Sequence, residues 1–235
     1  MAAQDTPARP MRRDAVRNHQ LVVEAAREVL AEFGTDASME LIASRAGVGV
    51  GTVYRRFPNK EALVDEIAGQ MLGSLIDAAG EELKRGDGTG LEEFLRILGQ
   101  SMSEHRGYAD KLVNHTKPAV IERLRDLIAE LLSQAQDFGR IGPEIAIGDI
   151  MTLAWALRGV VESGGTVVPD AWQRTLDIYL AGLRSPEPPS TRPSVTREQL
   201  SRVSVHHGQT GPAAHGSHAA HAAGSGPASG SGARG

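Results

Sequence analysis

Apolar side chains recur at three- and four-residue spacing along nearly the whole stretch from residue 14 to residue 184. This spacing puts them on one face of successive helices, and the strict alternation of apolar and polar residues that marks a half-buried strand does not occur. The first segment, about 14–33, already shows the pattern, with Val22, Ala26 and Val29 on one face. The sequence therefore predicts an all-α fold.

Glycine, proline and capping residues divide this stretch into separate helices. Gly47 suits a helix C-terminal cap, Ser38 and Asn59 suit N-terminal caps, and Pro58 should end a helix. We therefore expect helices at about 14–33, between Ser38 and Gly47, and at about 50–56, 60–85, 91–105, 117–138, 144–163 and 170–184. Residues 106–116 are either irregular or a short helix. The overall expectation is an N-terminal three-helix domain linked by a long helix to a C-terminal helical bundle.

The composition changes after residue 184. Several prolines follow closely, and Gly, Ala, Ser and His then dominate. A segment with so few apolar side chains cannot offset the entropy of becoming ordered. We expect residues 185–235 to be a disordered low-complexity tail, with only transient helix at 195–205. A solvated tail also explains its histidines better than a metal site does: His206, His207, His215, His218 and His221.

Several classes of site and location are excluded by composition. The chain has no cysteine, which excludes disulfides, thiolate metal sites and cysteine nucleophiles. No apolar run has the length that a bilayer requires, and the N-terminus, with Pro7 and Pro10, lacks the apolar core of a signal peptide. We expect a cytoplasmic protein with no membrane partner, no cofactor and no resident metal.

Basic residues are concentrated in the first part of the chain. Residues 1–60 hold 9 Lys or Arg against 7 Asp or Glu, a charge of +2, whereas the remainder carries −6. Local basic patches matter more for phosphate contact than the total charge of −4. Residues 1–13 would form a flexible basic arm that either reaches a DNA duplex or stays free in solution.

Residues 42–63 have the layout of a helix-turn-helix. Two short helices meet at a tight glycine turn, and the start of another helix follows directly. In this motif the second helix, here 50–56, enters the major groove of DNA. Gly49 and Gly51 keep its N-terminal end thin, so that its backbone can approach the duplex closely.

The side chains on and after this helix suit nucleic-acid contact. Thr52 and Tyr54 offer hydroxyl groups, and Arg55 and Arg56 offer positive charge. Lys60 lies at the start of the next helix, where free backbone N–H groups already favour a phosphate. Two of these residues have a structural alternative, since Arg55 could be a solvated surface charge and Tyr54 could pack its ring inward.

This stretch resembles the TetR family of one-component regulators. The resemblance runs from about residue 17 to residue 67, over an ordered set of positions: Ala25-Ala26, Phe33-Gly34, Ile42-Ala43, Ala46-Gly47-Val48, Gly51-Thr52-Val53-Tyr54, Phe57 and Lys60-Glu61-Ala62-Leu63. It implies a DNA-binding domain at residues 14–60 in which Thr52, Tyr54 and Lys60 contact phosphates.

The resemblance further implies that Val50 and Arg55 lie where base edges are read. Two positions depart from the family pattern. Gly49 stands where Ser or Thr often caps the recognition helix, at a modest cost in helix stability. Arg56 stands where His is common, and we expect it to keep a contact with the DNA backbone.

Residues 61–184 would then form a helical ligand-binding and dimerisation domain. The resemblance implies that helices 144–163 and 170–184 pair with those of a second copy, because a helix-turn-helix normally needs two copies to reach sites about 34–36 Å apart on DNA. Packing within one chain is the alternative. A ligand pocket combines an apolar lining with a few polar groups, and the candidates are Met71, Leu75, Met102, His105, Tyr108, His115 and Trp155.

The function implied is a ligand-responsive repressor. A homodimer would bind a palindromic operator, and a small molecule would release it by tilting the long helix 60–85. A DNA-binding regulator without a small-molecule effector, including an activator, is the alternative. An enzyme is not expected: Glu104, His105 and Asp110 could form an acid–base cluster, but nothing in the sequence fixes their geometry.

Overall fold

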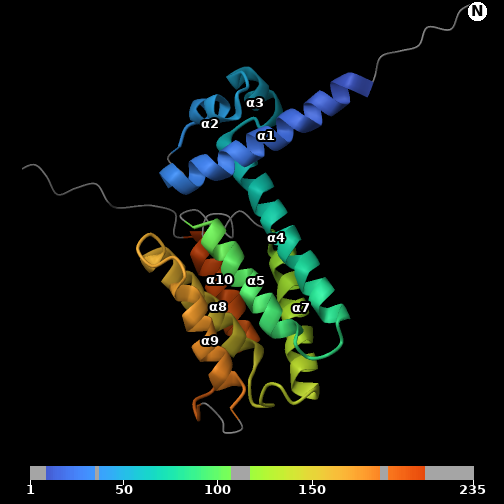
Figure 1. Ribbon diagram of the computed structural model, residues 1–235, viewed down its shortest axis with the longest axis vertical. Coiled ribbons are helices and arrows are strands. Elements are labelled where there is room, and N and C mark those ends of the chain that lie inside the picture. The colour runs from blue at the N-terminus through green and yellow to red at the C-terminus, as the bar shows by residue number, and fades with distance from the viewer. Residues whose placement is uncertain (1–8, 35–36, 107–116, 186–189, 210–235) are drawn as a thin grey trace, which may run out of the picture.

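The computed structural model describes residues 9–34, 37–106, 117–185 and 190–209, and all their regular structure is helical. The helices are α1 (Arg9–Phe33), α2 (Met39–Ala46), α3 (Val50–Arg56), α4 (Lys60–Lys84), α5 (Gly90–Glu104), α7 (Pro118–Asp137), α8 (Ile147–Gly164), α9 (Ala171–Leu183) and α10 (Arg197–Gln209). Helices α1 to α3 form a small unit at one end, and α4 runs from it into a bundle of the remaining helices (Figure 1). The expected all-α fold is confirmed.

The ends of the short helices follow the capping residues that the sequence provides. Ser38 Oγ accepts a hydrogen bond of 3.2 Å from the backbone N–H of Leu41 at the start of α2. Asn59 Oδ1 accepts one of 2.8 Å from the N–H of Ala62 at the start of α4. Gly47, with φ of 66°, ends α2 in the left-handed region that glycine adopts without strain. Local sequence thus sets the helix-turn-helix boundaries.

A continuous hydrophobic core joins the small unit to the bundle through α4. Helix α4 buries Leu63 and Ile67 near its start and Leu75 and Ala79 farther along, and it packs against α1, α5 and α7. Helices α8 and α9 complete the bundle against α5. None of the helices in the described ranges combines the length and apolar character needed to cross a bilayer.

Helix α1 starts earlier than the sequence pattern indicated. It begins at Arg9 rather than near residue 14, so residues 9–13 of the expected flexible arm are helical. Pro10 is compatible with this start, because the first turn of a helix tolerates a residue without an N–H group. The first eight residues lie outside the described part of the chain.

The beginning of the expected tail also differs from its prediction. Residues 197–209 form α10, and Leu200 on this helix is only 1% exposed. Arg197 forms an ion pair with Asp126 of α7, and this bond raises the pKa of the guanidinium above its usual value. One buried leucine and one ion pair thus hold α10 against the bundle, although its segment contains few apolar side chains. Residues 210–235, where disorder was also expected, lie outside the described ranges.

Candidate nucleic-acid interface and ligand cavity

Helix α3 is anchored by its apolar side chains and turns its polar side chains outward. Val53 and the following Phe57 are buried in the core of the small unit. The polar side chains of the helix are accessible, since Tyr54, Arg55 and Arg56 are exposed and Thr52 is half-buried, and Val50 at its start is exposed as well. Because α3 has only seven residues, these buried contacts fix its orientation, and its remaining surface is available to a partner.

The basic end of α3 lies against α1. Arg56 Nε donates a hydrogen bond of 3.1 Å to His19 Nδ1, and the His19 ring stacks on Phe57 with centroids 5.5 Å apart. Thr52, Arg55 and Arg56 line a shallow hollow together with Asn18 and His19. The sequence analysis did not identify Asn18 and His19, because their approach to α3 depends on how α1 packs across it.

Two further predicted contact residues lie close to the start of α2. Tyr54 Oη donates to Glu40 Oε1 at 3.4 Å, so the tyrosine keeps its hydroxyl at the surface. Lys60 Nζ donates to the carbonyl oxygen of Ala37 at 3.1 Å. The six predicted DNA-contacting side chains thus all belong to α3 or to the first residue of α4, and each is exposed or half-buried.

Polar contacts connect the small unit to the middle of α4. Arg27 Nη2 of α1 donates to Gln70 Oε1 at 2.9 Å, and Gln70 Nε2 donates to Glu66 Oε1 at 2.9 Å. Glu66 also lies 3.4 Å from His19 Nε2. We call His19, Arg27, Glu66 and Gln70 the α1–α4 network. Through His19, this network reaches Arg56 on α3.

Helices α1 and α2 are joined by a separate charged cluster. Arg45 of α2 donates to Glu32 at 2.8 Å and to Glu28 at 3.4 Å, both on α1. These bonds, the one to Glu32 first, raise the pKa of the Arg45 guanidinium above its ordinary value. The arginine thus links α2 to α1 through two ion pairs.

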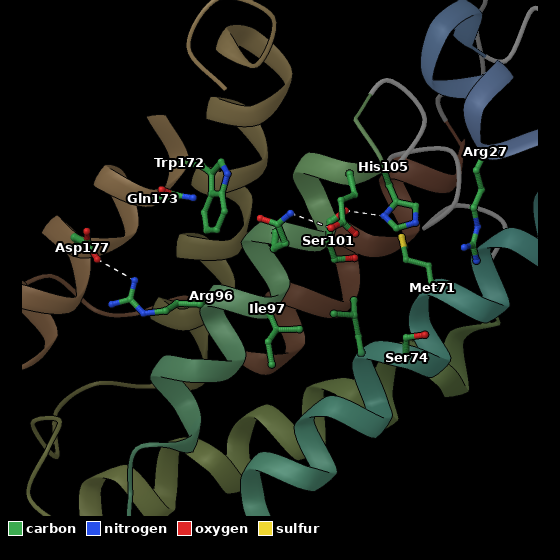
Figure 2. Close-up of a pocket in the computed structure, with 13 residues that line it drawn as sticks. Arg27, Met71, Ser74, Arg96, Ile97, Ser101, His105, Trp172, Gln173 and Asp177 are labelled. Atoms are coloured by element: carbon green, nitrogen blue, oxygen red, sulfur yellow. Dashed lines mark hydrogen bonds and ion pairs between the residues drawn. The ribbon is translucent and has the colours of Figure 1, made fainter. Parts of the chain in front are cut away.

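The bundle contains two neighbouring spaces that share part of their walls. The smaller, which we call the core cavity, has a volume of about 170 Å³. It is lined by Met71, Leu72, Leu75, Leu98, Ser101, Met102, Ile121, Leu124, Arg125, Ile128, Met151, Ala154, Trp155, Arg158 and Leu200. The larger, which we call the side cleft, measures about 660 Å³ and lies beside α4, α5 and the start of α9 (Figure 2).

The predicted pocket residues divide between these two spaces. Met71 and Leu75 line both, and Met102 and Trp155 line only the core cavity. His105 lines the side cleft, where its Nδ1 lies 2.7 Å from the carbonyl oxygen of Ser101 (Figure 2). The two other candidates, Tyr108 and His115, lie outside the described residues.

The sequence analysis missed two arginines in the core cavity. Arg125 lies on the apolar face of α7, in register with Ile121, Ile128 and Leu132, and only 5% of its surface is exposed. Arg158 reaches the same cavity from α8. A charged residue at a core-facing helical position is a signal that the sequence contains, and Arg125 could have been found from it.

The acidic and histidine side chains do not gather into a metal site in the described part of the chain. Glu104 Oε1 accepts a hydrogen bond from Gln100 Nε2 at 2.9 Å, one turn earlier on α5. Asp110, the third member of the acid–base cluster considered from the sequence, lies outside the described residues.

The three helices of the small unit, with the outward face of α3, define a helix-turn-helix DNA-binding domain. Residues 22–67 match the bacterial regulatory proteins of the TetR family, and residues 87–185 match the C-terminal domain of SbtR-like transcriptional regulators. The chain belongs to the TetR family. Members of this family are DNA-binding transcription factors rather than enzymes.

Solved structures and curated relatives agree with this membership. The TetR regulator of Mycobacterium vanbaalenii is 31% identical, with a TM-score of 0.56, over 75% of this chain and 100% of that one. A TetR regulator from Streptomyces coelicolor is 28% identical, with a TM-score of 0.56, over 72% and 99%. The HTH-type transcriptional regulator YhgD of Bacillus subtilis is 38% identical over 71 residues, 30% of this chain. The match covers only 37% of YhgD.

Proposed function

We propose that this protein is a cytoplasmic transcriptional repressor that binds a palindromic operator as a homodimer and is released by a small molecule. The observation that carries the proposal is the outward face of α3, which buried Val53 and Phe57 fix in place. A short helix held in this way, with hydroxyl and guanidinium groups on its free side, suits the major groove.

The DNA contacts follow from the positions of the side chains. Thr52, Tyr54 and Lys60 bind phosphates, and Val50 and Arg55 face base edges. Lys60 combines its charge with the positive end of the dipole of α4, a 25-residue helix whose N-terminus favours an anion. In addition, Arg56 binds the DNA backbone with the part of its guanidinium that does not contact His19.

Dimerisation uses the outer faces of α8 and α9. In the single chain, Ile178 of α9 is 60% exposed and Tyr179 is 43% exposed, and both line a hollow with Thr152 of α8. Large apolar side chains at the surface that lie together mark an interaction surface. A Cβ atom added at Gly159 or Gly182 would have no heavy atom within 4 Å, which leaves room there for a second copy to approach closely.

The effector binds in the core cavity. This space is largely apolar, with a few polar groups, as ligand sites usually are. Met71 and Leu75, in the middle of α4, form part of its wall. A ligand that displaces them also shifts the helix that begins at the DNA-binding domain. An effector-free regulator would be favoured by a bundle filled with side chains, and the cavity argues against that alternative.

The DNA-binding proposal is tested by fluorescence anisotropy with the DNA upstream of the protein's own gene, at two salt concentrations. We expect tight, competitor-resistant binding that weakens with salt. In the double variant Tyr54→Ala/Lys60→Ala, affinity should fall by about tenfold or more, and the salt slope should drop by about 1, as the loss of one ionic phosphate contact requires.

Lys84→Ala is the matched control, since Lys84 is an exposed lysine at the far end of α4. Its affinity should equal that of the unmodified protein. Should the protein bind this DNA no better than random DNA, a genome-wide search for sites follows. If that search also finds no specific site, the proposal is overturned.

The dimer is tested by the molar mass in solution and by the affinity for the operator. A charged Glu in place of Ile178 should break the apolar contact between the copies, so Ile178→Glu should be monomeric at micromolar concentration and bind DNA at least about tenfold more weakly. Ile97→Glu, on α5 and also at the surface, should remain dimeric. A dimeric Ile178→Glu with full affinity would contradict this interface.

A further inference from the structure

We infer that the core cavity accepts a small organic acid, with its carboxylate against Arg125 and Arg158 and its apolar body among the surrounding side chains. This inference rests on the proposed effector site and specifies its ligand class. Among the described residues, the lining contains two arginines and no acidic side chain, while most of the remaining wall is aliphatic, thioether or aromatic. An apolar space whose wall carries two positive charges complements an amphipathic anion.

Arg125 is the strongest part of this argument. It is the only charged residue classed as buried in the described part of the chain. Burying a guanidinium is costly unless acceptors replace its hydration. Glu122, one turn earlier on α7 and partly exposed, accepts a hydrogen bond from Arg125 Nη1. The planar fork of an arginine can serve acceptors on more than one side, so a ligand carboxylate can approach from the cavity while Glu122 binds from its own side.

Arg158 adds a second positive charge from the opposite helix. Arg125 lies on α7 and Arg158 on α8, so the two positive charges of the wall come from different elements. Each guanidinium offers charge-assisted hydrogen bonds, which are shorter and stronger than neutral ones. An acid bound between them joins α7 to α8, whereas the matching alcohol lacks the charge that both arginines recognise.

The volume limits the size of the apolar body. A dry apolar cavity of about 150 Å³ holds a benzene molecule, and the core cavity measures about 170 Å³. Leu200 of α10 closes part of its wall. Aromatic acids with one ring and aliphatic acids of about six carbons are therefore the expected sizes.

The side cleft lacks this charge pattern. Its wall mixes both signs, with Arg27 and Arg96 against Glu104 and Asp177. Arg96 Nη1 and Asp177 Oδ1 already pair at 3.0 Å across the cleft wall (Figure 2). A wall that carries both signs of charge shows no preference for an anion.

The test compares acids with alcohols of the same skeleton. Calorimetric titration of the full chain with phenylacetate and hexanoate, at fixed ionic strength, is set against 2-phenylethanol and hexan-1-ol. We expect each acid to bind at least about tenfold more tightly than its alcohol, the size of effect that a charged hydrogen bond gives. If no acid binds more tightly than its alcohol, or if no acid binds at all, the inference is overturned.

Arginine variants show whether the preference comes from the cavity. Arg158→Met and Arg125→Met should lose most of the acid preference while still binding the alcohols. Arg123 is an exposed arginine on α7 outside the cavity, so Arg123→Met is the matched control and should keep the preference for acids. Should Arg125→Met fail to fold, as judged by its thermal melt, Arg158→Met decides the question. An acid preference that survives in Arg158→Met overturns the inference.

This experiment separates the ligand class from the regulator function. Operator binding is measured by anisotropy on the same preparations, without added acid. If operator binding is specific but the acids fail, only the ligand class is wrong. If operator binding is absent and the acids still bind through the arginines, the DNA-binding proposal fails and the ligand class stands.

Discussion

At the scale of single residues, α3 contains a glycine near its start, Gly51, that neither the packing nor the backbone conformation of the folded chain requires. A Cβ atom added at Gly51 would have no heavy atom within 4 Å, and no positive φ constrains the position. Glycine inside a helix costs about 0.5–1 kcal/mol relative to alanine. A glycine that the fold does not need is therefore best explained by what approaches from outside.

Gly51→Ala separates folding from DNA binding. We expect the free energy of unfolding to stay equal or to rise by up to about 1 kcal/mol, because alanine favours the helix. DNA affinity should fall by about tenfold or more, because the methyl group holds the helix away from the groove and weakens several contacts together. Thermal melts and anisotropy measure the two effects. Gly69→Ala, at an equally open position in α4, is the control and should leave DNA affinity unchanged.

Residue-scale patterns predicted the caps of the short helices better than the wall of the core cavity. Ser38 and Asn59 cap their helices as the sequence indicated, because a cap depends on neighbours only three residues away. Met71 and Leu75 were found as cavity residues because they lie on the apolar face of a regular helix. Arg125 was missed although its core-facing position on α7 could be read from the sequence, whereas the place of Leu200 in the wall depends on how α10 docks and could not.

At the scale of whole elements, α10 shows the limit of composition as a guide. The segment after residue 184 is poor in apolar side chains, but α10 docks through buried Leu200 and the ion pair of Arg197 with Asp126. A Cβ atom at Gly148 of α8 would lie 2.0 Å from the carbonyl oxygen of Val195. Because Gly148 has no side chain, the segment that leads into α10 can pack directly against α8. This contact depends on the folded bundle and cannot be read from composition.

Leu200→Ala tests whether α10 sets the size of the ligand. Removing the side chain enlarges the core cavity, so octanoate should gain about tenfold in affinity relative to hexanoate, because each buried CH₂ contributes about 0.8 kcal/mol. Hydrogen exchange in residues 197–203 should also become faster. Calorimetry and exchange mass spectrometry measure these effects. Ser201→Ala, at an exposed position on α10, should change neither, and an unchanged chain-length preference in Leu200→Ala would remove α10 from the site.

At the scale of the whole molecule, α4 is the element that both sites share. Its 25 residues span about 37 Å, from Lys60 beside α2 to the far end of the bundle. Met71 and Leu75 in its middle contact the core cavity. The α1–α4 network joins the DNA-binding domain to α4 within one turn of Met71, since Gln70 precedes it directly. If a ligand displaces α4 as we propose, these contacts would carry the displacement to α1 and, through His19 and Arg56, to α3.

Gln70→Leu should weaken this transmission while leaving both sites intact. The substitution removes the hydrogen bonds to Arg27 and Glu66, so α1 no longer follows α4 closely. We expect the acid-induced loss of operator affinity to shrink by roughly two- to thirtyfold, the range for residues that carry coupling. Affinity for the acid in the DNA-free protein should stay the same.

Because coupling is reciprocal, acid titrations with and without operator must give the same factor as operator titrations with and without acid. Gln100→Leu, which loses a hydrogen bond within α5 only, should keep the full coupling. If Gln70→Leu keeps it too, the signal passes through the apolar contacts of α1 with α4 instead.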